Sequence, residues 1–300
     1  MPGRSEWSVG EPRRLALDGT VHTVRVRVVG GAVNVVGTDD PTARLEVGAI
    51  EGPPLTVVLE DGTLTVAYDD LPWKGFLGLL DRKGWQRDAD VSLAVPAGTR
   101  VEVGVVGADA VVTGIQGRTS VRGISGGVTL VGLTGDVRAE TVSGGVEAQG
   151  VTGDLRFNSV SGDLTVIDGG GSSVRADSVS GDMVVDLDLG RTARPTDVRL
   201  NSVSGEIAVR LPHPADAVVD ASTAGGSVSC AFEDLRVSGQ WGAKQITGTL
   251  GAGNGRLRAT TVSGSIALLR RPPVDGEEPD APGPPDDTVP PAEPSLRKDV

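Results

Sequence analysis

A short phrase recurs at a step of nine residues through the middle of the chain. It consists of an aliphatic residue, then Ser or Thr, then Gly. The copies are residues 124–126, 133–135, 142–144, 151–153 and 160–162. Residues 115–117, with Gln as the central residue, precede the series by one more step. Self-similarity at a fixed period indicates a solenoid, in which near-identical units stack on one another.

Apolar residues stand at every second position between these phrases. Val128 and Leu130 follow one phrase, and Leu155 and Phe157 follow another. A period of two is typical of a strand with one buried face. Gly allows backbone conformations that other residues avoid, and Ser or Thr can hydrogen-bond local backbone groups. Each unit is therefore predicted to be one short strand followed by one tight corner.

Pairs of units give a longer repeat of eighteen residues, because Ser and Thr phrases alternate along the chain. Three nearly identical copies contain Ser-Val-Ser-Gly followed by an acid, at residues 158–163, 177–182 and 201–206. A later copy is residues 261–264, and a degraded copy is residues 223–226. Stacked coils would place equivalent residues about 4.8 Å apart.

Two columns of side chains are predicted from this stacking. The valines of the three copies are expected to form a ladder inside the solenoid: Val160, Val179 and Val203. The serines that follow them are expected to form a hydroxyl ladder at one corner: Ser161, Ser180 and Ser204.

The predicted fold class is all-β: a right-handed, single-stranded β-solenoid, similar to a β-helix, with irregular N-terminal strands. Its repeats are of nine and eighteen residues. The alternative is an antiparallel sandwich, which predicts turns at irregular spacings of about 8–12 residues and no verbatim repetition. The regular step favours the solenoid. Among the N-terminal strands, Asp61-Gly62 is a hairpin signal.

Changes of pattern divide the chain into three segments. Residues 1–19 are predicted to be an N-terminal cap segment, and residues 20–270 form the β-strand-repeat domain. Nine of the thirty residues in 271–300 are Pro, and apolar residues are sparse there. Such a segment cannot bury enough surface to offset its ordering entropy, so a disordered acidic tail is expected.

Residues 71–90 interrupt the strands with aromatic and basic residues, and they are interpreted as an insertion in the domain. One interpretation is a flap that covers an open edge of the solenoid. The other is a docking or membrane-surface patch. The candidate interaction patch consists of Trp73, Phe76, Leu77, Leu80 and Trp85.

Charge and cysteine content restrict the partners and the compartment. The net charge of −12 argues against a nucleic-acid partner, because phosphate binding needs a basic surface. The single cysteine, Cys230, cannot form an internal disulfide. The first residues lack the apolar region of a signal peptide, and no run approaches the ~18 apolar residues of a membrane span. A cytoplasmic protein is expected, and its oligomeric state stays open.

No motif for catalysis or for a cofactor is recognised. The two histidines, His22 and His213, have no local nucleophile motif beside them. Clusters of Cys or His that could bind zinc are absent from the sequence. The run Gly251–Gly255 lacks the Lys of a phosphate-binding loop and is interpreted as a corner.

Acids that follow the corner glycines are candidate calcium ligands. They are interpreted as occupying one equivalent position of the repeat: Asp136, Asp154, Asp163, Asp182 and Glu206. Stacked carboxylates could bind calcium, but the corner lacks the longer Gly-rich phrase of calcium-binding β-rolls. The preferred interpretation is a solvated charge that bonds a neighbouring backbone amide. A pair of carboxylates for sugar hydrolysis is also conceivable, although Phe157 is the only aromatic residue among residues 115–209.

The repeats at residues 158–166, 177–185 and 201–209 resemble those of the bacterial putative-adhesin family of β-strand-repeat proteins, a toast-rack-like domain of unknown function. The resemblance covers residues 20–269. It implies a right-handed solenoid-like fold, no established catalytic residues, and a role in adhesion or envelope-stress systems. The apparent lack of an export signal instead favours a cytoplasmic scaffold or sensor.

The functional prediction is a non-enzymatic scaffold or interaction module without a cofactor or resident metal. An unidentified protein partner is expected, with peripheral membrane contact through residues 71–90 as a further option. Two alternatives stay open: a calcium-stabilised binding module and a carbohydrate-active enzyme.

Overall fold

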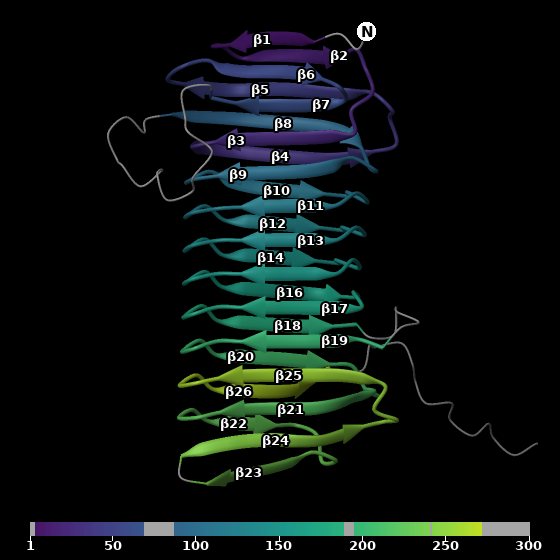
Figure 1. Ribbon diagram of the computed structural model, residues 1–300, viewed down its shortest axis with the longest axis vertical. Helices are drawn as coiled ribbons and strands as arrows, with labels where there is room; N and C mark the ends of the chain where they lie inside the picture. The colour runs from purple at the N-terminus through teal and green to yellow at the C-terminus, as the bar shows by residue number, and fades with distance from the viewer. Residues whose placement is uncertain (1–3, 69–86, 189–194, 241, 272–300) are drawn as a thin grey trace, which may run out of the picture.

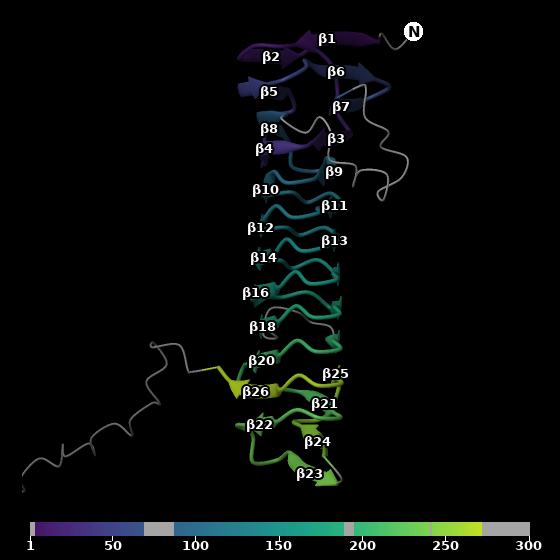
Figure 2. The ribbon, with the colours of Figure 1, turned by 90° about the vertical axis from the view of Figure 1, so that its left-hand side faces the viewer.

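The computed structural model describes residues 4–68, 87–188, 195–240 and 242–271. Within these residues every regular element is a strand, so none of them forms a helix that could span a membrane. The strands form one tall stack, with the N-terminal strands at one end (Figure 1). Seen from the side, the stack consists of two facing sheets (Figure 2).

The first sheet, sheet A, has fourteen described strands. In spatial order they are β1 (Ser5–Val9), β6 (Leu55–Glu60), β7 (Thr63–Ala67), β3 (Thr23–Val28), β9 (Arg100–Val105), β11 (Thr119–Arg122), β13 (Val137–Glu140), β15 (Leu155–Asn158), β17 (Ser173–Asp177), β19 (Asp197–Asn201), β25 (Gly255–Thr261), β21 (Ala217–Thr223), β24 (Ala243–Leu250) and β23 (Arg236–Gln240).

The second sheet, sheet B, has twelve described strands. In spatial order they are β2 (Arg13–Leu17), β5 (Ala43–Glu51), β8 (Asp88–Pro96), β4 (Gly30–Thr38), β10 (Asp109–Thr113), β12 (Val128–Val131), β14 (Val146–Gln149), β16 (Leu164–Gly169), β18 (Met183–Leu187), β20 (Ile207–Leu211), β26 (Ile266–Arg270) and β22 (Val228–Cys230).

Each nine-residue step takes the chain from one sheet to the other, and two steps complete a coil. In sheet A, Val137 of β13 pairs in parallel with Leu155 of β15. In sheet B, Val128 of β12 pairs in parallel with Val146 of β14. Both pairs are eighteen residues apart, as the repeat predicts. The prediction of an all-β solenoid is confirmed, and the antiparallel sandwich is wrong for the regular coils.

Chain order and stack order differ at both ends of the solenoid. Near the C-terminus, β25 and β26 lie between the β19–β20 coil and the β21–β22 coil, although they follow both in sequence (Figure 1). Near the N-terminus, β3 and β4 lie next to β9 and β10, so strands β5 to β8 stack outside them. Antiparallel pairs such as β1–β6, β2–β5 and β21–β24 occur only in these end regions of the described chain.

Aliphatic side chains from both sheets fill a narrow core. Phe157 is fully buried, and its register neighbours in the coils on either side are Ala139 and Ala176. The small neighbours give the ring room within the spacing of about 4.8 Å between strands. The Asp61-Gly62 hairpin is also confirmed: both residues have positive φ and they join β6 to the antiparallel β7.

The corner glycines are required for a different reason from the one expected. Gly144, Gly162, Gly181 and Gly205 do not have positive φ, so conformational freedom does not explain them. A Cβ added to Gly181 would lie 2.0 Å from the carbonyl oxygen of Gly162 in the preceding coil. Each glycine therefore stands where the backbone of the preceding coil passes too closely for any side chain.

The prediction that Val160, Val179 and Val203 line the interior is wrong. They do stack in one column, since Ser180 N donates to Val160 O and Val203 N donates to Val179 O. Their side chains, however, are exposed by 51%, 48% and 48%. The column is therefore an apolar stripe on the outside of one corner.

Hydroxyl groups take the inward position that the valines were expected to occupy. Ser178 is buried, and its Oγ accepts a hydrogen bond of 3.0 Å from Gly181 N. Ser202 accepts one of 2.9 Å from Gly205 N in the same way. A buried backbone N–H needs an acceptor, which a valine cannot provide. The predicted hydroxyl ladder is confirmed, and it is separate from the buried serines. Ser180 and Ser204 donate hydrogen bonds to the carbonyl oxygens of Val160 and Val179 in the preceding coil.

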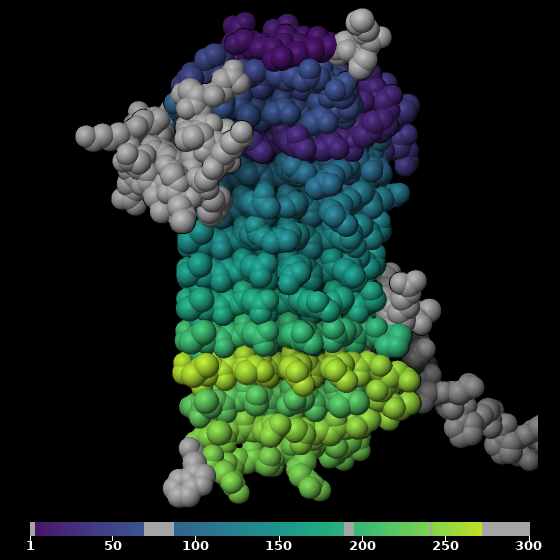
Figure 3. Space-filling model, viewed as in Figure 1, coloured from purple at the N-terminus to yellow at the C-terminus, as the bar shows by residue number. Residues whose placement is uncertain are grey.

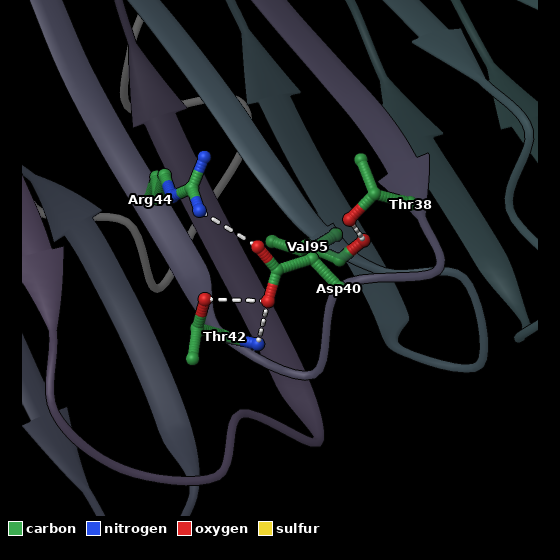
Figure 4. A network of polar contacts seen from close by, with 5 residues as sticks. All are labelled: Thr38, Asp40, Thr42, Arg44 and Val95. Atoms are coloured by element: carbon green, nitrogen blue, oxygen red, sulfur yellow. Dashed lines mark hydrogen bonds and ion pairs between the residues drawn. The ribbon is translucent and has the colours of Figure 1, made fainter.

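A network of polar contacts holds the loop between β4 and β5 at the N-terminal end (Figure 4). Asp40 accepts hydrogen bonds from Thr42 Oγ1 at 2.7 Å and Thr42 N at 2.9 Å, and it pairs with Arg44 at 2.7 Å. Beside it, Thr38 Oγ1 donates to Val95 O at 3.3 Å. The hydrogen bonds from Thr42 hold the pKa of Asp40 below its usual value, and the charge of Arg44 lowers it further.

Replacing Gly181 with Ala is expected to lower the free energy of unfolding by about 3 kcal/mol, because the new methyl group overlaps a backbone carbonyl. Gly98→Ala is the matched control, since an added Cβ there meets nothing within 4 Å and its change should stay within about 0.5 kcal/mol. Urea unfolding of both variants measures the difference. Equal stability of the two variants would contradict the close-approach explanation.

Asp40 should stabilise the protein only while its carboxylate is charged. A lowered folded-state pKa means that this contribution is present above the unfolded pKa of about 3.9 and is lost as the pH falls through the folded value. The melting temperature of Asp40→Asn should thus fall below that of the wild type at about pH 6, with a smaller gap at about pH 3. Asp39→Asn, which removes the same charge outside the network, should show a smaller gap at both pH values.

Candidate binding surface

The candidate interaction patch of the sequence analysis lies outside the described residues. Trp73, Phe76, Leu77, Leu80 and Trp85 all fall within residues 69–86. The proposed roles of this segment stay predictions.

The two histidines lie at opposite ends of the stack. His22 precedes β3 in the N-terminal region, and His213 follows β20 near the C-terminal coils. Among the described residues, no group of three or more His, Cys, Asp and Glu side chains is arranged to hold a metal ion. The structure does not bring the titratable residues singled out by the sequence into one site.

The recurrent acids form two separate columns, so the single register inferred from the sequence is wrong. Asp163 and Asp182 precede strands of sheet B, and Asp136 and Asp154 precede strands of sheet A. The nine-residue step alternates between sheets, and this places the two sets at opposite corners.

Both acid columns bind groups within the chain. Asp182 N donates to Asp163 Oδ1 at 2.9 Å, and Glu206 N donates to Asp182 Oδ1 at 2.8 Å. These are the hydrogen bonds from backbone amides to carboxylates that the preferred interpretation predicts. At the other corner, Asp136 pairs with Arg118 at 3.1 Å, and Asp154 accepts a hydrogen bond from Ser172 Oγ at 2.7 Å.

The Gly-rich run Gly251–Gly255 is a turn between β24 and β25, as predicted. Asp216 accepts hydrogen bonds from Asn254 N at 3.0 Å and from Asn254 Nδ2 at 2.6 Å. These bonds lower the pKa of Asp216. A carboxylate of the protein thus already uses the backbone amide that a phosphate group would need.

Sheet A carries a column of arginines on its outer face, which the sequence analysis missed. Five successive strands of the sheet place an arginine at the same register position, pointing away from the core. We call this column the arginine ladder; its members are Arg138, Arg156, Arg175, Arg199 and Arg258. Ser120 precedes it in the stack, and Asp220 follows it.

Polar and acidic residues flank the arginine ladder on both sides. From β11 to β25 the outer face presents eight arginines and five carboxylates. The arginines are the five of the ladder with Arg118, Arg122 and Arg256; the carboxylates are Asp136, Glu140, Asp154, Asp177 and Asp197. The face is therefore locally positive on a chain whose net charge is −12.

Three arginines of the ladder have carboxylate partners. Arg138 bonds Glu140, Arg175 pairs with Asp197 at 3.4 Å, and Arg258 pairs with Asp220 at 3.5 Å. The last two distances are long for charged hydrogen bonds. These exposed pairs contribute little to stability.

Arg156 and Arg199 have no carboxylate within ion-pair distance among the described residues. Arg156 is exposed, whereas Arg199 is half-buried and its Nε has no hydrogen-bond partner in the described chain. A guanidinium has five N–H donors, so both side chains retain most of their capacity to bind an anion.

Glu140 is the acid most closely held by this face. Its partial burial works to raise the pKa, but hydrogen bonds from Arg122 and Arg138 outweigh burial, and the pKa is lowered. Glu140 therefore stays charged and keeps Arg138 occupied, which leaves Arg156 as the first unoccupied arginine of the ladder.

A shallow depression of about 420 Å³ lies over the first three arginines of the ladder. Arg138, Arg156 and Arg175 line it together with Asp136 and Asp154. A second depression of about 390 Å³ adjoins it around Arg122 and Glu140. Both are open surface features on the same sheet.

The outer face of sheet B is different in character. Its central column runs through Thr129, Glu147, Thr165, Val184 and Ala208, with no arginine. The fold thus tolerates neutral residues at outward positions. The sequence carries a signal for the ladder, since an arginine follows the first aliphatic residue of strands β13, β15, β17, β19 and β25, at a position that points outward.

Comparison with known proteins identifies the family. A model of the Toastrack DUF4097 family matches residues 52–269. No curated protein matches the chain.

Two solved structures resemble the chain at low identity. One is described as a "putative cell adhesion protein" from Clostridium sporogenes, with 12% identity, a TM-score of 0.25, and coverage of 90% of this chain and 100% of that one. The other is a "Putative lipid binding protein" from Parabacteroides distasonis, with 13% identity, a TM-score of 0.39, and coverage of 88% and 98%. Neither likeness is close enough to indicate what this chain binds. The family match covers most of the sequence, so the chain belongs to the Toastrack DUF4097 family.

Proposed function

We propose that this protein is a non-enzymatic interaction module that binds an extended partner on the outer face of sheet A. The observation that carries the proposal is the difference between the two faces. Sheet A has an uninterrupted column of five arginines, whereas the central column of sheet B has none between β12 and β20.

The destabilising effect of the arginine ladder on the fold supports a binding role. Like charges directly opposite each other on neighbouring strands are destabilising. The equivalent positions of sheet B show that neutral residues satisfy the fold. Positions that lower stability without serving the fold are expected where a protein binds a partner.

The architecture suits an extended partner better than a small molecule. Where no grey atoms lie over them, the coils follow one another as bands across the face turned to the viewer (Figure 3). The depression over Arg138, Arg156 and Arg175 is an open one, whereas small-molecule sites are usually concave and enclosed. A rigid stack of identical spacings can hold the charges of a long partner in fixed register.

We further propose that this binding serves adhesion or an envelope-stress response, as the family resemblance implies. The cytoplasmic location and the contact through residues 71–90 remain predictions. A calcium-stabilised module and a carbohydrate-active enzyme are less well supported, because the described acids bond amides, hydroxyls and arginines of the chain itself.

Blocking one face at a time tests this proposal. Asn158→Cys on sheet A and Gln149→Cys on sheet B lie on successive strands, β15 and β14, and therefore at the same height on opposite faces. Each variant is made with Cys230→Ser, coupled to a bulky maleimide–polyethylene glycol, and sedimented with bacterial envelope fragments. The label at residue 158 should abolish co-sedimentation, and the label at residue 149 should not.

Two results would contradict the proposal. Failure of the unlabelled protein to co-sediment would argue against an envelope partner. Equal binding by both labelled variants would place the contact elsewhere on the chain.

A further inference from the structure

We propose that the arginine ladder binds a linear acidic polysaccharide that lies along the long axis of the solenoid. Carboxylates on one side of the polymer would bind Arg156 and Arg199. This inference rests on the proposed function and names the chemistry of the partner.

The spacing of the two unoccupied arginines is the first argument. Arg156 on β15 and Arg199 on β19 are separated by one strand, β17, so their backbones lie about 9.6 Å apart along the axis. In an extended β-(1→4)-linked uronan, alternate sugars place their carboxylates on the same side. One disaccharide advances by about two strand spacings, so successive same-side carboxylates meet both arginines.

Other linear polyanions fit this spacing less well. In an extended acidic peptide, side chains on one side recur about every 6.6 Å, which is out of register with the ladder. Nucleic acid carries a phosphate about every 3.4 Å along each strand. Such dense charge would be repelled by Asp177 and Asp197, which flank the ladder.

The residues beside the ladder suit sugar hydroxyls. Asn158, Asp177, Asn201 and Thr260 form the adjacent column, in register with the arginines. Their amide, carboxylate and hydroxyl groups can accept or donate hydrogen bonds with hydroxyl groups. The acids that disfavour a phosphate polymer are therefore acceptors for a polysaccharide.

The mode of recognition is charge and hydrogen bonding rather than stacking on an aromatic ring. Phe157, the aromatic residue of β15, is fully buried in the core and cannot contact a ligand on this face. A planar guanidinium can hold a carboxylate through two parallel hydrogen bonds, which fixes the position of the sugar. Arg199 is the more constrained of the two arginines, because its Nε is already removed from solvent without a partner.

Calorimetric titration with oligomannuronate, a β-(1→4)-linked uronan, tests the inference on the full chain. The wild type should bind, and binding should weaken about ten-fold for Arg156→Gln or Arg199→Gln and about a hundred-fold for the double variant. Arg14→Gln/Arg44→Gln removes the same charge from sheet B and should bind like the wild type. Melting curves establish that each variant is folded.

Poly-L-glutamate and polyphosphate of matched charge distinguish the polysaccharide from other polyanions. Both are expected to bind at least about ten-fold more weakly than oligomannuronate. Comparable binding of either polymer, or unchanged oligomannuronate binding by the double variant, would overturn the inference. If oligomannuronate fails while the label at residue 158 still blocks envelope binding, the proposed function stands and only the polysaccharide is wrong.

Discussion

The close approach of backbone to backbone at each corner is the contact on which the rest of the structure depends. A carbonyl of one coil passes directly over the glycine of the next, for example Gly162 over Gly181. The glycine N–H donates a hydrogen bond to a serine or threonine hydroxyl oxygen inside the corner, as Gly181 N does to Ser178 Oγ. The hydroxyl bond fixes the shape of each corner, and the close approach lets the backbones of successive coils hydrogen-bond directly, so every strand meets its neighbours in the same register.

The ends of the stack show how a repeat of this kind is terminated. Successive parallel coils would leave an open strand edge, which invites pairing with another chain. At the C-terminal end the weak Thr223–Gly226 copy stacks outside the strong Thr261–Gly264 copy, and β24 and β23 then add antiparallel strands. The copy that keeps the repeat phrase therefore lies inside the stack, where both of its faces must fit a neighbouring coil.

Outward positions are free of these requirements, and the two faces use that freedom differently. Sheet B fills them with threonine, glutamate, valine and alanine, whereas sheet A aligns arginines over five coils. Because the coil spacing is fixed by the corners, any outward residue repeated in the sequence becomes a straight row of like groups. A solenoid thus converts a sequence repeat into a linear array with a regular spacing, and the arginine ladder is such an array.

The sequence by itself determined the architecture of the regular coils, because local signals alone specify it. Alternating apolar residues fix the buried face, and the step of nine residues fixes the corners. What only the tertiary structure decided depends on contacts between distant segments. The assignment of alternate units to opposite sheets separates Asp136 from Asp163, and the need to satisfy Gly181 N turns Ser178 inward and Val179 outward. The out-of-order stacking of β25 and the alignment of Arg199 with Arg258 join residues 59 positions apart, which no local pattern encodes.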